Sequence, residues 1–126
     1  MAHAREADGV ECCGLVAAQR GRATRIIRCT NASPTPAVRY RIDPREQLAA
    51  FRSMDAEGEQ LLAIYHSHPA STPYPSATDR AEAFYPDAMY ILVSTRSGSA
   101  EVRGYRIAGS PPGSDKAVRE VELVAS

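Results

Sequence analysis

The middle of the chain reads Leu61-Leu-Ala-Ile-Tyr-His-Ser-His-Pro-Ala-Ser-Thr-Pro-Tyr-Pro-Ser-Ala-Thr-Asp79. Its first part, Leu61 to His66, is apolar on both faces, which is typical of a central strand covered on both sides of its sheet. The loop from Pro69 to Pro75 holds three prolines, which restrict it and return the chain toward the strand end. Ser76 then begins a helix with Asp79 in its first turn. We therefore expect a strand end, a constrained loop and a helix start to meet at one place.

Polar side chains at this meeting point are of the kinds that bind metals. His66 and His68 are two positions apart at the end of the predicted strand, so both imidazoles leave the same face. With an oxygen ligand from Asp79, two nitrogens and an open fourth position are typical of a hydrolytic zinc site. Each feature alone also has a structural explanation, because a strand-end histidine is often a satisfied polar residue and Asp79 at N3 would stabilise a helix start. Their combination at one spacing favours the metal site.

Strand patterns also flank this segment. They lie at Leu15 to Ala18, Thr24 to Cys29, Met89 to Thr95, Glu101 to Ile107 and, as a last short segment, Val118 to Val124. The first two predict a hairpin with its turn near Gly21. The third has the buried character of a central strand, and the fourth is a more polar neighbour nearer an edge.

A helix is predicted to begin at Asp43, because Asp43-Pro44-Arg45-Glu46 supplies an N-cap, a proline at N1 and a glutamate at N3. Leu48, Phe51 and Met54 then recur on one side as far as Gly58.

The second predicted helix begins at Ser76 and ends before Pro86, with Ala81 and Phe84 on its inner face. Strands interleaved with two or three helices predict the α/β (α+β) class around one sheet, in a single domain that spans residues 1–126.

The composition of the chain argues against some classes of function. Fifteen basic and fifteen acidic residues give a formal net charge of zero, which argues against nucleic-acid binding through a broad cationic face. No apolar run approaches the roughly 20 residues that span a membrane, and the charged N-terminus does not resemble a signal peptide. We therefore expect a cytoplasmic protein whose three cysteines, Cys12, Cys13 and Cys29, are reduced and buried.

The pattern His66-x-His68, seven residues, Ser76, two residues, Asp79 resembles the signature of the JAMM (MPN-plus) zinc metallopeptidases. That family also has an upstream glutamate in a segment reading Glu-x-Cys-Gly-hydrophobic, and residues 11–15 read Glu-Cys-Cys-Gly-Leu. The resemblance implies the JAMM/MPN (cytidine-deaminase-like) fold, with a single curved mixed β-sheet flanked by two or three helices.

The resemblance also implies a role for each site residue. His66, His68 and Asp79 would hold one Zn²⁺ with a catalytic water, Glu11 would be the general acid/base, and Ser76 would hydrogen-bond the oxygen of the tetrahedral intermediate. General chemistry agrees, because zinc lowers the pKa of its water to about 7 and a nearby carboxylate can then take the proton. Without the family pattern, Glu11 would be interpreted as a surface glutamate.

Several other residues are expected to have structural rather than catalytic roles. Gly14 is expected to permit a close approach of backbone or a turn, and Tyr65 and Tyr90 are expected in the core. The segment Arg39-Tyr40-Arg41 could face a substrate groove, but a solvated strand edge is preferred. His3 is expected to be exposed on a short leading helix.

Only ten residues precede Glu11, whereas family members usually have a further strand and most of a helix there. Either the true start lies further upstream, or the N-terminus is shortened and its first helix is reduced to the final turn. A missing element would expose a sheet edge, through which the chain could form a homodimer.

The substrate is implied by the resemblance alone. JAMM proteins cleave bonds at the C-terminal tail of ubiquitin or ubiquitin-like proteins. Residues 38–43, 46–48 and 90–96 resemble the small bacterial subgroup, which implies a ubiquitin-like sulfur-carrier protein ending in Gly-Gly, with cysteine or a peptide as the released adduct.

Two other interpretations stay open. A non-catalytic MPN-type scaffold would bind no zinc. A nucleoside deaminase would need His-x-Glu and a later Pro-Cys-x-x-Cys, and the sequence has neither.

Overall fold

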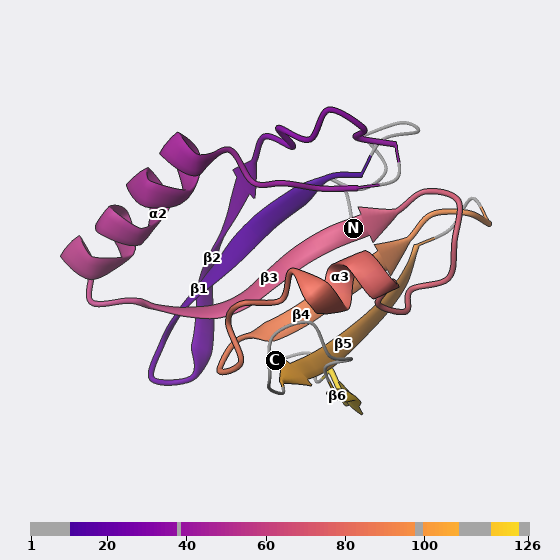
Figure 1. Cartoon of the computed structure of the whole chain (residues 1–126). Helices are drawn as coiled ribbons and strands as arrows, with labels where there is room; N and C mark the ends of the chain where they lie inside the picture. The colour runs from indigo at the N-terminus through magenta and orange to yellow at the C-terminus, as the bar shows by residue number, and fades with distance from the viewer. Residues whose placement is uncertain (1–10, 38, 98–99, 109–116, 124–126) are drawn as a thin grey trace.

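The computed structural model describes residues 11–37, 39–97, 100–108 and 117–123. They form one six-stranded sheet and two helices (Figure 1). The elements in chain order are β1 (Cys13–Gln19), β2 (Arg22–Cys29), α2 (Pro44–Ala56), β3 (Gln60–His68), α3 (Ala77–Ala81), β4 (Met89–Ser94), β5 (Glu101–Ala108) and β6 (Ala117–Val121). The predicted α/β (α+β) class with a single sheet is confirmed. No helix in the described ranges has the length and apolar character needed to cross a membrane.

The sheet has the order β2-β1-β3-β4-β5-β6 and is mixed. Only β3 and β4 are parallel among the described strands, and every other neighbouring pair is antiparallel. The crossover between β3 and β4 carries α3, which lies on the same face of the sheet as α2 (Figure 1). The C-terminal end of β3 is therefore central in the sheet and directly beside the start of α3.

The β1–β2 hairpin turns where the sequence predicts it. Gln19 pairs with Arg22, which leaves Arg20 and Gly21 as a two-residue loop, and both have positive φ, 52° and 79°. Positive φ at both central positions is the geometry that matches the twist of the flanking strands.

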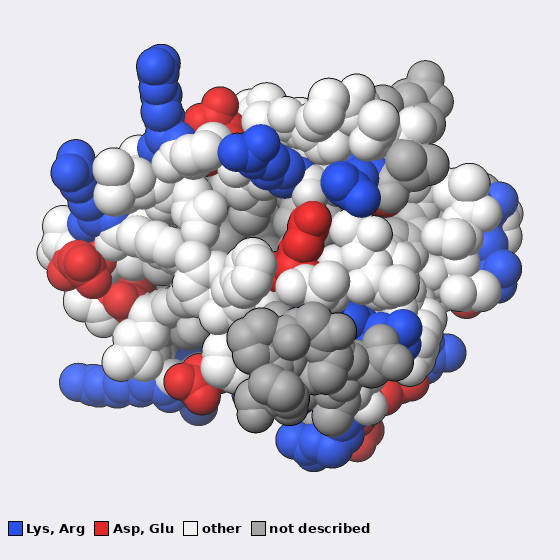
Figure 2. All heavy atoms as spheres, viewed as in Figure 1, with Lys and Arg blue, Asp and Glu red and all other residues white. Residues whose placement is uncertain are grey.

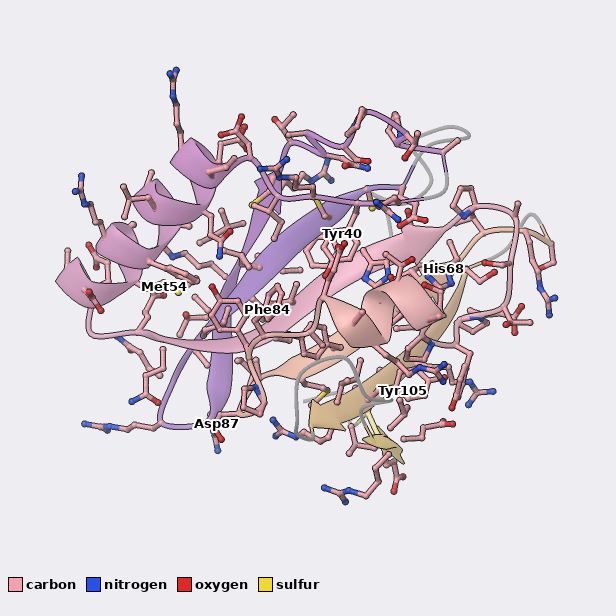
Figure 3. All side chains as sticks on the ribbon, viewed as in Figure 1. Tyr40, Met54, His68, Phe84, Asp87 and Tyr105 are labelled. Atoms are coloured by element: carbon pink, nitrogen blue, oxygen red, sulfur yellow. The ribbon has the colours of Figure 1, made fainter. Side chains whose placement is uncertain are left out.

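Helix α2 begins as predicted, because the Asp43 side chain accepts hydrogen bonds from the backbone N–H groups of Arg45 and Glu46. Its buried residues are Ala50 and Met54, and Met54 points toward the sheet (Figure 3). Leu48 is 52% exposed, so the apolar side predicted from Leu48, Phe51 and Met54 is not buried at its first position.

The second helix is shorter than predicted. It is capped by Ser76 and ends at Ala81, and its C-cap is Glu82. Ala81 is exposed and Phe84 is 71% exposed, so the prediction that both lie on an inner face is wrong. Beyond the helix the chain turns toward β4, and Ala83 is buried instead.

Buried residues form one cluster on each face of the sheet. The larger cluster, on the face of the two helices, includes Leu15, Met54 and Tyr90, and the smaller one includes Val16 and Tyr65. Tyr65 and Tyr90 are core residues as predicted. A Cβ atom added to Gly14 would lie 2.3 Å from the ring of Tyr65, which confirms the predicted close approach.

The remaining structural predictions concern the cysteines, the last strand and His3. The three cysteines are buried free thiols, as predicted. The last segment forms β6 but ends at Val121. His3 lies outside the described residues.

Candidate metal centre

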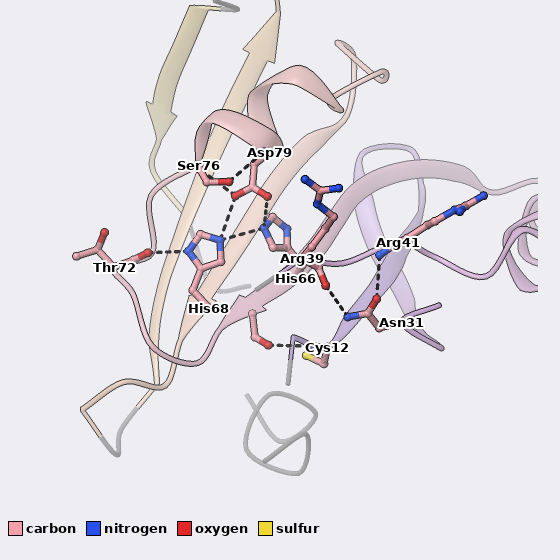
Figure 4. A network of polar contacts seen from close by, with 10 residues as sticks. Cys12, Asn31, Arg39, Arg41, His66, His68, Thr72, Ser76 and Asp79 are labelled. Carbon is pink, nitrogen blue, oxygen red and sulfur yellow. Dashed lines mark hydrogen bonds and ion pairs between the residues drawn. The ribbon is translucent and has the colours of Figure 1, made fainter. Parts of the chain in front are cut away.

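His66 and His68 project from the end of β3 on the face that carries α3 (Figure 4). Their residues are 1% and 4% exposed, and their Nε2 atoms are 3.2 Å apart. The alternation of side chains along a strand produces this arrangement, because positions i and i+2 share a face.

Asp79 reaches both histidines from the first turn of α3. Its Oδ1 lies 3.2 Å from Nε2 of His66, and its Oδ2 lies 3.0 Å from Nε2 of His68. Ser76 and Asp79 form a capping box: the backbone N–H of Ser76 donates to Oδ2 of Asp79, and the N–H of Asp79 donates to Oγ of Ser76. The helix cap therefore orients the carboxylate toward the imidazoles.

These three side chains fit a tetrahedral zinc ion. Zinc binds imidazole nitrogen and carboxylate oxygen at about 2.0–2.1 Å, so neighbouring ligand atoms of a tetrahedron lie about 3.3 Å apart. The two nitrogens are 3.2 Å apart, and each lies 3.0 to 3.2 Å from a different oxygen of the Asp79 carboxylate. Two imidazole nitrogens and a carboxylate are also the ligand types that zinc prefers in hydrolytic sites.

The loop before α3 determines which nitrogen of His68 is available. Nδ1 of His68 lies 2.8 Å from the carbonyl oxygen of Thr72. A carbonyl can only accept, so Nδ1 carries the hydrogen and Nε2 of the neutral ring keeps its lone pair. Such a contact orients a metal-binding histidine and raises its basicity.

The pairing register of β1 and β3 places Glu11 at the site. Cys13 pairs with His66, and Cys12 exchanges hydrogen bonds with Ser67, so Glu11 comes opposite His68. A carboxylate oxygen of Glu11 and one nitrogen of each histidine all lie within 4.8 Å of one another. The residue is 5% exposed, and its Oε1 has no hydrogen-bond partner among the described residues. A buried acceptor without a partner beside two histidine nitrogens fits a site for a metal and its water.

The electrostatics separate the roles of the two carboxyl groups. Burial raises the pKa of Glu11 from 4.5 to about 7; the charge of His68 opposes this rise and that of Asp79 adds to it. Burial also acts to raise the pKa of Asp79, but hydrogen bonds with His66 and His68 outweigh it and hold that pKa well below its usual range. Asp79 is therefore ionised as a ligand must be, whereas Glu11 can take up and release a proton near neutrality.

The two imidazoles also differ. Burial lowers the pKa of His66 and outweighs its bond with Asp79, which keeps the ring neutral. Burial also acts to lower the pKa of His68, but the contacts with Asp79 and Thr72 outweigh burial and raise this pKa.

Ser76 lies at the rim of the site and is exposed. Its Oγ accepts from the backbone N–H of Asp79, so its own hydroxyl hydrogen remains available for donation. The structure thus brings together all five residues selected from the sequence: Glu11, His66, His68, Ser76 and Asp79.

Sequence reasoning missed the contribution of Tyr40. Its ring stacks on the imidazole of His66, with centroids 4.1 Å apart and an angle of 18° between the planes, and Figure 3 shows it beside the site. The preferred assignment of residues 39–41 to a solvated strand edge is wrong, because the segment is irregular and Tyr40 is only partly exposed. The alternating Arg-Tyr-Arg pattern suggested the strand, and no spacing in the sequence relates Tyr40 to His66.

No pattern in the sequence indicated the role of Asn31 either. Its side-chain amide donates to the backbone carbonyls of Glu11 (2.8 Å) and Arg39 (3.0 Å), and its Oδ1 accepts from the backbone N–H of Arg41 (2.9 Å). One side chain therefore links the backbone of Glu11 to the segment that carries Tyr40.

Known proteins show similarity over most of the chain. A family model described as "Prokaryotic homologs of the JAB domain" matches residues 1–108. The CysO-cysteine peptidase of Mycobacterium tuberculosis is 46% identical over 110 residues, which cover 85% of this chain and 75% of that protein. A desampylase of Haloferax volcanii is 34% identical over 100 residues, which cover 75% and 72%.

Two solved structures share the fold. The solution structure of a protein from Desulfitobacterium hafniense has a TM-score of 0.79 and 32% identity, and the match covers 98% of this chain and 83% of that one. A JAB1/MPN domain protein from Archaeoglobus fulgidus has a TM-score of 0.53 and 16% identity, with 82% and 76% covered, and supports the fold alone.

Proposed function

The chain belongs to the prokaryotic JAB-domain family, a minimal prokaryotic form of the JAMM/MPN family, and from this we propose that it is a zinc-dependent peptidase acting on a small carrier protein. Relatives named as a CysO-cysteine peptidase and a desampylase indicate a hydrolase. The bond cleaved is the one after the C-terminal Gly-Gly tail of a ubiquitin-like sulfur carrier, and the group released is cysteine or a peptide. The observation that carries this proposal is that Glu11 lies close to His66 and His68, the two imidazoles that Asp79 also contacts.

His66, His68 and Asp79 would hold the zinc ion, which when bound lowers the pKa of a water to about 7 and polarises the scissile carbonyl. Asp79 contributes a negative ligand because its carboxyl is ionised. His68 presents Nε2 because Thr72 accepts the hydrogen of Nδ1.

Glu11 is the proton carrier of the reaction. Oε1, which has no partner among the described residues, takes a proton from the attacking water and then delivers it to the nitrogen of the leaving amine. In the metal-free site burial raises the pKa of Glu11 to about 7, and a bound cation would favour the ionised form, which is the form that accepts the proton of the water. A positioned acid/base of this kind contributes roughly 10²- to 10⁴-fold to the rate.

Ser76 stabilises the charge that develops on the carbonyl oxygen. Its Oγ is fixed by the N–H of Asp79, and its hydroxyl hydrogen donates toward the substrate. Removing one donor of this kind typically costs roughly 10²- to 10³-fold in kcat.

The cellular setting follows from the thiols. Cys12, Cys13 and Cys29 are buried and unpaired, and burial raises the pKa of each thiol, which makes them unreactive. Reduced cysteines of this kind fit the cytoplasm, to which we assign the protein.

The test uses the zinc-loaded full chain and a carrier protein ending in Gly-Gly that is joined to cysteine. We expect mass spectrometry to show the carrier shortened to Gly-Gly, and a chelator to stop the reaction. Glu11→Gln should keep stoichiometric zinc and lose roughly 10²- to 10⁴-fold in turnover, whereas Asp79→Asn should lose zinc. Glu57→Gln, at an exposed glutamate beside α2, is the matched control and should behave as the parent.

Three outcomes would contradict the proposal. The purified protein could bind no zinc, as expected for the alternative of a non-catalytic MPN-type scaffold. Glu11→Gln could retain full turnover, which would remove its acid/base role. It could instead lose the metal, which would make Glu11 a ligand.

A further inference from the structure

The segment of residues 39–41 is held against the candidate metal centre. Tyr40 stacks on His66 at 4.1 Å between centroids, so Arg39 and Arg41 flank a residue that contacts the site directly. Asn31 binds the backbone on both sides, at the carbonyl of Arg39 and at the N–H of Arg41. The N–H of Arg39 also donates to the carbonyl of Thr35 at 3.1 Å. The backbone of Arg39 is therefore fixed relative to the ligands.

The side chain of Arg39 is directed to the same region as the ligands. In the view of Figure 4, the side chain of Arg39 extends toward the side of the site where His66 and Asp79 lie, whereas the side chain of Arg41 extends away from them. Both arginines are exposed. Within the described ranges, no carboxylate lies within 4 Å of the Arg39 guanidinium, so its donors are available to a bound molecule.

A substrate carboxylate at this site needs a partner beyond the groups of the candidate metal centre. Glu11 and Asp79 are both carboxyl groups, and their side chains lie against the imidazoles. On the face seen in Figure 2, acidic and basic side chains are interspersed, so no broad positive surface draws an anion to the site. The zinc ion that the site would hold offsets the charge of the two carboxyl groups, but its coordination serves the water and the scissile carbonyl, so a carboxylate on the substrate needs a hydrogen-bonding partner of its own beside the site.

A leaving amino acid brings such a carboxylate. When the adduct on the carrier is a single amino acid, its free α-carboxylate is two bonds from the scissile nitrogen. An isopeptide or an internal peptide bond has no free carboxylate at that position. A guanidinium at the rim would therefore distinguish the two classes of bond, since its planar donors match a carboxylate with two parallel hydrogen bonds.

Given the proposed peptidase function, on which this inference rests, we infer that Arg39 is a specificity-determining residue that binds the free α-carboxylate of the amino acid released from the carrier. The enzyme then acts preferentially on carriers with a single terminal amino acid, and Asn31 is the positioning residue that holds the Arg39 backbone beside the ligands.

The test compares two substrates that differ in one group: a carrier joined to cysteine with a free carboxylate, and the same carrier joined to cysteine amide. With zinc-loaded full chain, we expect the ratio of kcat/KM for acid over amide to be roughly 10 to 100. Arg39→Gln should bring this ratio to about 1, and Arg39→Lys should restore part of it because it keeps the charge. Arg41→Gln, at the neighbouring arginine that points away, should keep the parent ratio.

Binding provides a second measurement that needs no turnover. In the Glu11→Gln background, the Kd of the acid should be lower than that of the amide by a similar factor, and Arg39→Gln should remove the difference. An equal loss on both substrates, or a parent without preference in either measurement, would overturn the role of Arg39. If the peptidase proposal fails instead, the parent cleaves neither substrate. The comparison of the two Kd values then still tests the role of Arg39.

Discussion

At the scale of single residues, Glu11 combines burial with a chemical role that requires ionisation. It is 5% exposed, and burial raises its pKa from 4.5 to about 7. For an acid whose pKa is raised by folding, the stability contribution is fully present below the unfolded pKa and is lost as the pH rises through the folded pKa. The metal-free protein should therefore lose stability between about pH 4.5 and pH 7 because Glu11 must ionise in a buried site.

We predict that Glu11→Gln stabilises the metal-free protein at pH 8 but not at pH 4.5. The glutamine keeps the shape and never ionises, so the difference in unfolding free energy should approach the order of 3 kcal/mol at pH 8, as the pKa shift implies. Thermal unfolding in the presence of a chelator at both pH values measures it. Glu57→Gln, at an exposed site, should show no such difference, and equal stabilities of parent and Glu11→Gln at pH 8 would mean that the carboxylate is well solvated.

At the scale of elements, the start of α3 has two functions. The helix has five residues, so its geometry depends strongly on its cap. Oγ of Ser76 accepts from the N–H of Asp79, and the same box orients Asp79 toward the histidines. The capping function requires an acceptor at position 76, whereas the proposed catalytic function requires a hydrogen to donate.

Substitutions at Ser76 should separate these functions. We predict that Ser76→Ala costs about 1 kcal/mol of stability and roughly 10²- to 10³-fold in kcat. Ser76→Asp should restore the stability, because aspartate is a good N-cap, but not the turnover, because its carboxylate has no hydrogen to donate. Ser76→Thr should restore both. Chemical denaturation and steady-state kinetics measure the two effects, and full turnover in Ser76→Asp would exclude the donor role.

The contact between β1 and β3 limits what position 14 can hold. Gly14 pairs with Tyr65, and the nearest ring atoms lie 2.3 Å from where a Cβ would be. We predict that Gly14→Ala destabilises the protein by about 1–3 kcal/mol or more, because the ring is fully buried and cannot move freely.

A double-mutant cycle with Tyr65→Leu tests the cause of this loss. The shorter side chain makes room for the new methyl group, so the cost of Gly14→Ala should be smaller in the Tyr65→Leu background. The same cost in both backgrounds would point to the backbone rather than to the ring. Denaturant unfolding of the four proteins gives the comparison.

These elements also show what the sequence could reveal. The central strand and the first helix were predictable, because apolar runs and the Asp43-Pro44 start are local signals. The exposure of Leu48 and Phe84 was not, because an apolar side chain does not by itself show whether the described part of the fold covers it. The length of α3 depends on where the chain must turn to enter β4, which is a property of the whole sheet.

Some residues of the site could also be predicted from the sequence, whereas others could not. His66, His68, Ser76 and Asp79 are close in the chain, so strand alternation and a helix cap were enough to group them. Glu11 could be added only through a family resemblance, since its place opposite His68 follows from strand register. Tyr40 and Asn31 carry no local signal, because their contacts depend on how residues 31–42 cross the sheet end.

At the scale of the whole molecule, the sheet ends in two edge strands, β2 and β6. On β2, Ile26 is 59% exposed, which would favour pairing with a second copy. Arg22, Arg25 and Arg28 lie on the same strand. Like charges on facing strands oppose edge pairing, so a homodimer through β2 would have to overcome this repulsion.

The candidate metal centre brings together separate parts of the chain. The ligands His66 and His68 come from the centre of the sheet and Asp79 from the crossover, and the proposed acid/base Glu11 lies just before β1. An ion bound to the three ligands is linked to folding, since the unfolded chain does not hold them together. At zinc concentrations 100 to 1,000 times the Kd, the stabilisation is about 3–4 kcal/mol.

We therefore predict that removal of zinc by a chelator lowers the Tm of the parent by roughly 10 °C or more. Asp79→Asn should lower the Tm of the zinc-loaded protein toward that of the metal-free parent and should respond little to the chelator. The asparagine keeps a side-chain oxygen for the N–H of Ser76, so the cap of α3 survives and the loss reports on the metal. Calorimetry with and without chelator measures both shifts. A chelator response in Asp79→Asn as large as in the parent would remove Asp79 from the ligand set, because a tetrahedral site cannot lose a charged ligand without losing affinity.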